Sequence, residues 1–346
     1  MSNTEYAPAL KQIVEPWEEL VARKENDFVS VNLGVLESIA AQNPDLKVPD
    51  WRFPGDNAEN DWAFATQVVV SSVINFHFLN RNRDAGENWA MTDPSGKVLT
   101  GSNALLTRLN QRFPEQEDIT SPDIRKLNAR AEFDAFLPDI PLAMQRRELL
   151  EDFAHGLANY FDGSVRNLIE STKDADGKLR LFNEGHGLAE VLADTSIFEQ
   201  AFFDTSYLDD LTFPFNKRAN LAPLLIYGRS TNSETLPTFA DIDQSGVIPD
   251  YRLPQAFRSM GAIAYSPKLA ELVDNWKPIM KNSAEEIEIR GATSYATAYL
   301  LKRINEIRAE AGQEPYNMAH IDFMLWKMGR GLKDGSFPHF TETTAY

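Results

Sequence analysis

The chain has 346 residues, 43% of them hydrophobic, which is enough apolar material for one large core or two smaller ones. It carries 51 Asp and Glu against 34 Lys and Arg, a formal net charge of −17, and this acidity argues against a polymeric nucleic acid partner, whose binding depends on basic groups. The absence of cysteine excludes disulfides, thiolate metal sites and cysteine nucleophiles. The N-terminal residues lack the cationic start and following apolar run of a secretory signal, so we expect a cytoplasmic protein.

The N-terminal part shows helical spacing of apolar residues over 7–25 and again over 30–42, and Pro16 is expected to break the first helix. Residues 62–79 are the most apolar stretch, but polar residues such as Ser71 and Asn75 interrupt it. We therefore expect a buried helix there and no membrane span. Because apolar surroundings favour the neutral imidazole ring, His77 is interpreted as a core histidine and not a catalytic one.

Residues 88–100 contain the clearest strand signal, two short apolar runs on either side of a turn. Helical patterns then follow one another, one after Ser102, one from Ser121 and one over 139–160. No repeats or long linkers separate them. The sequence therefore predicts a mainly α protein with a minor β-hairpin, folded as a single domain over residues 1–346.

Two adjacent cations, Lys217 and Arg218, open a helix predicted to run to Tyr227. Cations at a helix start oppose the macrodipole, which favours anions there. This mismatch leaves two interpretations. The pair is either a solvated basic patch or part of a site for a bound phosphate.

The stretch 247–255 places one carboxylate, Asp250, between two prolines that restrict the backbone, Pro249 and Pro254. Tyr251 and Arg252 follow it directly, and a helical pattern from Ala256 is expected to continue through Ile263. Asp250 can be the N-cap of this helix, which is the common role of Asp before a proline-containing first turn. A rigidly held carboxylate beside a phenol and a guanidinium also suits an active site, and the stretch alone does not decide between these roles.

The C-terminal part predicts two more helices, one over 283–312 that begins with a capping box and one over 317–330. Asp322 lies on the apolar side of the last helix, an unusual place for a charge without a partner. Nucleotide-binding glycine loops, serine-hydrolase motifs and metal-ligand clusters are missing from the sequence, and the five histidines are scattered. We therefore expect no metal and no cofactor. Carboxylate chemistry by Asp250 and Asp322 remains as the enzymatic option.

Short blocks along most of the chain resemble the queuosine salvage family, the queuosine 5′-phosphate N-glycosidases. The blocks that carry this resemblance are Ile74–Phe78, Ile140–Leu142 before Arg147, Gly163–Ser164, Lys217–Ala219, Asp250–Gln255, Gly261–Ala262, Tyr265–Ser266, Glu288–Gly291, Asp322, Leu325–Trp326, Pro338–His339 and Tyr346. Each block is short, but their order and spacing together make the likeness specific.

The resemblance implies a helical fold similar to DNA glycosylases without their DNA-binding surface. It also implies hydrolysis of the bond between a 7-deazaguanine base and ribose 5-phosphate, a step in the salvage of queuine for tRNA modification. In the family the aspartate at the position of Asp250 is catalytic, and the aspartate at the position of Asp322 contacts the base. Lys217, with Arg218, would hold the 5′-phosphate of a small-molecule nucleotide, and Tyr251 completes the expected site.

Three positions depart from the family's pattern, and the histidine expected before the block Ile74–Phe78 has no counterpart around Phe53–Gly55. Ile248 stands where the family has an aromatic residue suited to stacking on the base, and Phe323 stands in place of a tyrosine and lacks its hydroxyl. Lys327 replaces an acidic residue, and a lysine near the protonated amine of queuine would repel it. These changes lead to the hypothesis that the substrate is a 7-deazaguanine nucleotide other than queuosine 5′-phosphate.

Two other functions remain open at this point. A DNA or RNA base glycosylase of related fold is disfavoured by the charge of −17. A non-catalytic nucleotide-binding protein would result if the substitutions around the site have removed turnover.

Overall fold

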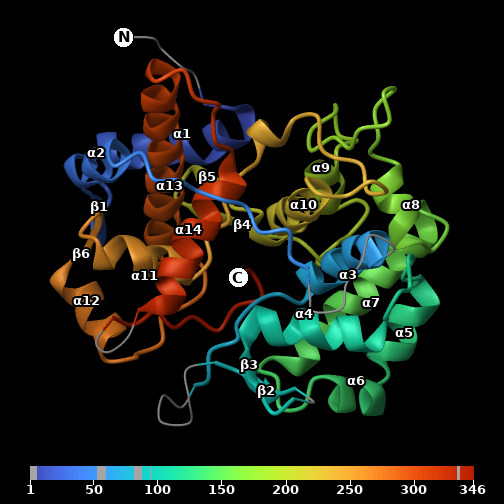
Figure 1. Ribbon diagram of the computed structural model, residues 1–346. Coiled ribbons are helices and arrows are strands. Elements are labelled where there is room, and N and C mark those ends of the chain that lie inside the picture. The colour runs from blue at the N-terminus through green and yellow to red at the C-terminus, as the bar shows by residue number, and fades with distance from the viewer. Residues whose placement is uncertain (1–5, 53–59, 82–87, 94, 333–335) are drawn as a thin grey trace. The chain divides into compact units, whose positions relative to one another are not determined.

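The computed structural model describes residues 6–52, 60–81, 88–93, 95–332 and 336–346. Helices dominate it and the strands form small two-stranded sheets, which confirms the predicted mainly α class (Figure 1). The chain divides into two compact units. Unit 1 consists of Met1–Val48, Asp204–Asn220 and Ile242–Glu342, and unit 2 of Pro49–Phe203, Leu221–Asp241 and Thr343–Tyr346. The single domain over 1–346 and the likeness to DNA glycosylases stay predictions.

Unit 1 contains the C-terminal helices, the N-terminal segment and a short central segment, with the strand pairs β1–β6 and β4–β5. Its elements are α1 (Pro8–Ala22), β1 (Val29–Val31), α2 (Leu33–Ala41), β4 (Thr205–Leu208), β5 (Leu211–Pro214), η3 (Ile242–Gln244), α11 (Arg252–Ser259), β6 (Ile263–Tyr265), α12 (Pro267–Asp274), α13 (Ala284–Glu310) and α14 (Met318–Gly331). The helix α10 (Lys217–Ser230) begins in unit 1 and passes into unit 2 after Asn220.

Unit 2 contains the middle of the chain. Its elements are α3 (Asp61–Val73), β2 (Ala90–Thr92), β3 (Val98–Thr100), α4 (Gly101–Arg112), α5 (Ser121–Asn128), α6 (Arg130–Phe136), α7 (Ala143–Tyr160), α8 (Val165–Glu170) and α9 (Leu188–Ala193). The antiparallel pair β2–β3 is the hairpin predicted over 88–100.

The long helix α13 is the centre of unit 1 and packs against α1, α2, α11 and α14. It begins where the sequence predicts, with the Ser283 hydroxyl accepting a hydrogen bond from the Glu286 amide. The Glu288 carboxylate accepts hydrogen bonds from three successive backbone amides, Asp27, Phe28 and Val29. A Cβ at Gly291 would lie 3.0 Å from the Trp17 ring. The block Glu288–Gly291 therefore joins α13 to the N-terminal segment by charge and close packing.

Three predictions about the helices of unit 1 are wrong. Residues 29–31 form β1, which pairs with β6, so the helix expected over 30–42 starts later, and the one expected to run through Ile263 ends at Ser259. Helical spacing cannot detect this pairing because the two strands are far apart in sequence. Pro16 lies inside α1 and does not break it. Apolar residues on both sides of Pro16 are buried, and this burial outweighs the one backbone hydrogen bond that proline removes.

The helix α3 is buried along its whole length, as the sequence predicts, but the expected extent over 62–79 is wrong, because the helix ends at Val73. The backbone carbonyls that follow are held by Arg146, whose buried guanidinium donates hydrogen bonds to Ile74, Phe76 and His77. The same guanidinium lies 4.1 Å from the centre of the Phe76 ring. His77 is 4% exposed, and its amide donates to the Tyr346 carbonyl. The block Ile74–Phe78 is therefore part of the core of unit 2.

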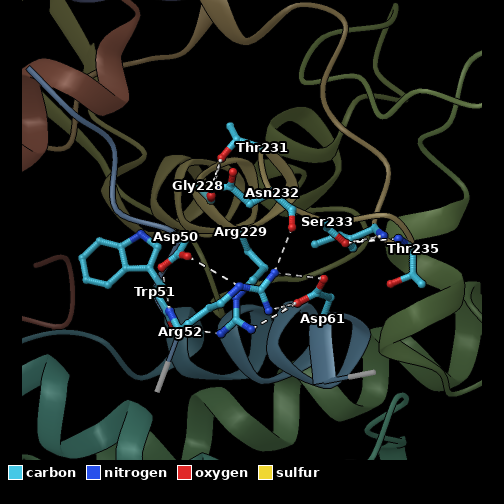
Figure 2. Close-up of polar contacts among 11 residues, drawn as sticks. Asp50, Trp51, Arg52, Asp61, Gly228, Arg229, Thr231, Asn232, Ser233 and Thr235 are labelled. Carbon is cyan, nitrogen blue, oxygen red and sulfur yellow. Dashed lines mark hydrogen bonds and ion pairs between the residues drawn. The ribbon is translucent and has the colours of Figure 1, made fainter. Parts of the chain in front are cut away.

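A buried ion cluster fixes α10 within unit 2 (Figure 2). Asp61 and Arg229 are both fully buried and form an ion pair, and Arg52 contacts the same carboxylate. Arg229 also donates to the Trp51 carbonyl, and Arg52 to that of Asn232. The Asp61 cluster, as we call these three side chains, thus ties α3, α10 and the segment before α3 together.

No described helix has the length and apolar character needed to cross a membrane.

We predict that Asp61→Asn lowers the free energy of unfolding by about 3–5 kcal/mol, because two guanidinium groups lose the carboxylate that compensates their burial. Urea unfolding measures the change. Glu151→Gln is the matched control, since it removes a carboxylate from an exposed ion pair with Arg125 and should cost less than about 1 kcal/mol. Equal effects of the two variants would contradict this account of the Asp61 cluster.

Candidate active site

The Asp250 carboxylate is held at the start of α11. One of its oxygens, Oδ1, accepts hydrogen bonds from the backbone amides of Arg252 (2.7 Å) and Leu253 (3.3 Å). The N-cap of this helix is Tyr251, so the interpretation of Asp250 as the N-cap is wrong by one position, although its carboxylate does bind the first two amides of the helix. The second oxygen, Oδ2, takes part in no hydrogen bond with the described residues. These two hydrogen bonds thus fix the carboxylate and leave one oxygen available for another partner.

Lys217 is the first residue of α10 and only 3% of its surface is exposed. Its backbone amide donates to Asp204 Oδ2 at 2.9 Å. The same carboxylate makes a two-pronged ion pair with Arg290 of α13, with both N–O distances at 2.7 Å and both side chains buried. A negative charge therefore stands at the start of α10. It resolves the mismatch between the macrodipole and the two cations that the sequence shows there.

Arg218 lies in different electrostatic surroundings from Lys217. It is fully buried, and burial lowers the pKa of its guanidinium to about 10, with Asp204 opposing the shift and Arg290 adding to it. The Asp204–Arg290 pair thus contributes charges that act on Arg218. Asp250 and Asp322 shift the pKa of Lys217, but they are not among the charges that shift the pKa of Arg218.

Asp322 lies in α14, which begins as predicted with Asn317 as its N-cap. The buried residues Ile321 and Leu325 flank it on the apolar side of this helix. Its Oδ1 atom is buried and accepts no hydrogen bond from the residues that the structure describes. A buried acceptor of this kind costs free energy unless a donor reaches it.

Lys217, Asp250 and Asp322 come together and shift one another's pKa. Burial lowers the pKa of the Lys217 ammonium to about 8, and the two carboxylates counteract this shift. Burial raises the pKa of Asp250, and Lys217 opposes the rise. Burial raises the pKa of Asp322 well above its usual range, and the charge of Asp250 raises it further. We call these three side chains the carboxylate–lysine site. Perturbed, mutually coupled groups of this kind are typical of functional sites.

The other expected site residues are placed as follows. Ile248 and Tyr251 are buried beside Asp250, and the Arg252 guanidinium lies 5.1 Å from the centre of the Tyr251 ring. Phe323 is half-buried and stacks on Trp326 with ring centres 6.2 Å apart. Lys327 is exposed and lies about 140° around α14 from Asp322. It is not among the charges that shift the pKa of Asp322.

Asn220 is a site-shaping residue that the sequence analysis missed. Its Nδ2 group donates to the carbonyls of Val247 (3.3 Å) and Phe215 (3.4 Å), and a Cβ at Gly246 would lie 2.5 Å from it. The first turn of α10 therefore holds the segment that leads to Asp250. The glycine directly before the stretch 247–255 is the signal that could have indicated such a close approach.

Within the part of the chain that the structure describes, no group of three or more His, Cys, Asp or Glu side chains could hold a metal ion. The carboxylate–lysine site itself offers two carboxylates and an ammonium group.

Comparisons with known proteins agree with the resemblance seen in the sequence. The family model described as queuosine salvage protein matches residues 56–346. A relative from Sphaerobacter thermophilus, named queuosine 5′-phosphate N-glycosylase/hydrolase, is 26% identical over 321 residues, which cover 90% of each chain. Relatives with the same name from Bos taurus and Mus musculus are 23% and 24% identical, over 85% and 80% of this chain and 84% and 77% of their own.

We predict that Asp322→Asn raises the melting temperature at pH 7.5 and that this gain shrinks as the pH falls towards 4. The pKa of Asp322 is higher in the folded protein than the ordinary 3.8, so ionisation at rising pH costs the folded state more than the unfolded one. The amide removes this cost. Below the ordinary pKa both proteins are uncharged at this position and the difference disappears.

Thermal unfolding monitored by circular dichroism across this pH range measures the effect. Asp134→Asn, at an exposed position of α6, is the control and should leave the melting temperature unchanged at every pH. An Asp322→Asn protein that is less stable than the wild type at pH 7.5 would show that the ionised carboxylate is well satisfied in the fold.

Proposed function

Because the chain belongs to the queuosine salvage protein family, we propose that it is a nucleotide N-glycosidase. It hydrolyses the base–ribose bond of queuosine 5′-phosphate or a related 7-deazaguanine nucleotide, and it releases the free base and ribose 5-phosphate. The names of the relatives support this reaction. The observation in the structure that supports it most is the carboxylate–lysine site, where two carboxylates of raised pKa share one buried lysine.

Asp250 is the proposed catalytic residue. Cleavage of an N-glycosidic bond builds positive charge on the sugar ring, and a fixed carboxylate beside C1′ stabilises that charge or attacks C1′ directly. Either route needs one oxygen that faces the sugar. This role is supported by the backbone amides of Arg252 and Leu253, which bind Oδ1 and leave Oδ2 available. Water completes the reaction at C1′, and the base departs with a proton.

Asp322 is the proposed binding residue for the base. A carboxylate suits the N1 and N2 hydrogens of a guanine-like edge, because it can accept both at once. In the protein alone, burial disfavours the ionised form and Oδ1 accepts no hydrogen bond from the described residues. The two donors of the base would supply this missing stabilisation. A 7-deaza base cannot be protonated at N7 to ease its departure, so hydrogen bonds of this kind carry more of the catalysis.

Lys217 is the proposed binding residue for the 5′-phosphate, since Asp250 and Asp322 both act on its charge. Arg218 supports it from the neighbouring buried ion pair and is not assigned direct contact. Because Lys217 is buried and the protein as a whole is acidic, the protein can bind a small nucleotide without attracting the phosphate backbone of DNA or RNA. We also propose that the protein is cytoplasmic and that it does not bind polymeric nucleic acid.

Ile248, Tyr251 and Phe323 are the proposed apolar contacts of the base and sugar. Lys327 points away from the Asp322 face of α14, so its positive charge gives little reason to exclude the protonated amine of queuine. Queuosine 5′-phosphate is therefore the first substrate to test, followed by nucleotides of other 7-deazaguanine bases.

We predict that Asp250→Ala lowers kcat for base release from queuosine 5′-phosphate by at least about 10³-fold, because the developing charge on the sugar loses its carboxylate. Chromatographic detection of the free base measures the rate. Asp134→Ala should retain the wild-type rate, since that residue is exposed on α6. If the wild type binds the nucleotide but releases no base, the protein is the non-catalytic binder of the alternative hypothesis.

We predict a bell-shaped pH dependence of kcat/KM. On the acid side activity falls as the coupled Asp250–Asp322 pair becomes protonated, with an apparent pKa above the ordinary 3.8. On the basic side it falls as the pH rises through about 8, where Lys217 loses its proton and its attraction for phosphate. In Lys217→Arg the guanidinium stays charged, so the basic limb moves to higher pH.

The nucleoside queuosine, which lacks the phosphate, is the control for this experiment. It should show the acid limb, free of the phosphate's own titration near pH 6, and no basic limb near pH 8. A basic limb that persists unchanged in Lys217→Arg would assign it to another group.

A further inference from the structure

The glycine Gly329 lies on the same face of α14 as Asp322, two helical turns further along. This helix packs against α11 (Figure 1). The first residue of α11, Arg252, comes two positions after Asp250, and both helices belong to unit 1. Gly329 is buried. The position of α14 against α11 therefore governs how far the Asp322 carboxylate lies from that of Asp250.

At Gly329 the two helices meet backbone to backbone. A Cβ at this position would lie 2.5 Å from the carbonyl oxygen of Arg252, and 3.1 Å from both its carbonyl carbon and its Cβ. Separations this short are not tolerated between non-bonded carbon and oxygen atoms. The first obstacle is backbone, which cannot rotate away as the end of a flexible side chain can. A side chain at 329 would therefore push α14 and the start of α11 apart.

The residue that Gly329 contacts is also the main anchor of the Asp250 carboxylate. The Arg252 amide donates the shorter of the two hydrogen bonds to Asp250 Oδ1, at 2.7 Å. A shift of the Arg252 backbone would thus be transmitted to Asp250 through one peptide unit and one hydrogen bond. Lys217 is held separately, by the Asp204–Arg290 pair, and would keep its place.

We propose that Gly329 is a positioning residue, whose missing side chain sets the separation between the carboxylate that acts at C1′ and the carboxylate that binds the base. This inference rests on the proposed N-glycosidase function. It predicts a defect in turnover that exceeds the defect in binding, because the phosphate site is unaffected and catalysis is more sensitive to placement than binding is.

The test compares Gly329→Ala with Gly331→Ala in the full chain. Both variants exchange a glycine of α14 for alanine, but a Cβ at Gly331 meets no described atom within 4 Å. With queuosine 5′-phosphate, we expect Gly329→Ala to lower kcat by about 10²-fold while KM changes less than about threefold. Gly331→Ala should keep the wild-type kcat and KM.

The acid limb of kcat/KM provides a second measurement. In Gly329→Ala it should move to lower pH, because the charge of Asp250 acts less strongly on a more distant Asp322. A purely structural role of the glycine would leave this limb in place.

Each other outcome overturns the inference. Wild-type kcat in Gly329→Ala shows that the separation is not set there. A proportionate loss in both alanine variants assigns the effect to the helix itself. A Gly329→Ala protein that fails to fold, as judged by circular dichroism, shows that the glycine acts on stability and not on placement. Absence of base release by the wild type is a distinct result, since it refutes the proposed function first.

Discussion

The buried ion pair between Asp204 and Arg290 is the interaction on which the carboxylate–lysine site depends. Its carboxylate binds both guanidinium nitrogens of Arg290 and the backbone amide of Lys217. It thus joins α13, the central helix of unit 1, to the start of α10. A buried pair contributes little net stability, because desolvation cancels most of the attraction, but loss of one partner is costly. The pair therefore acts mainly as a geometric constraint. It holds Lys217 at a buried position, where burial disfavours the charged form of the ammonium group.

The same constraint explains how an acidic protein can offer a site for an anion. The charge of −17 is spread over the whole chain, whereas Lys217 is buried and is acted on by nearby groups. Its carboxylate neighbours Asp250 and Asp322 are themselves poorly solvated, so each group in the site lacks part of the stabilisation that water would give. A nucleotide supplies complementary charge and donors to all of them. Binding energy from the phosphate and the base can then be used to place the sugar against Asp250.

Glycines and backbone amides provide the precision of this arrangement. Gly329 allows α14 to meet the start of α11, and Gly246 allows Asn220 to hold the segment before Asp250. Neither residue carries a functional group. Their contribution is that they let three carriers of charge, which lie far apart in the sequence, approach one another at fixed separations. The Asp61 cluster performs a comparable task in unit 2, where it secures the second half of α10 by buried charge.

The sequence by itself determined the helical class, the starts of α13 and α14, and the two aspartates to consider, because capping residues, apolar spacing and an out-of-place charge are local signals. It could not show the pairing of β1 with β6, nor that apolar burial carries α1 through Pro16, since these depend on contacts between distant segments. Local patterns also could not separate Lys217 from Arg218, or reveal that Lys327 lies off the Asp322 face and is not among the charges that shift the pKa of Asp322. Only the tertiary structure decided which charges share an environment, because desolvation and coulombic coupling depend on distance and burial in space and not on spacing along the chain.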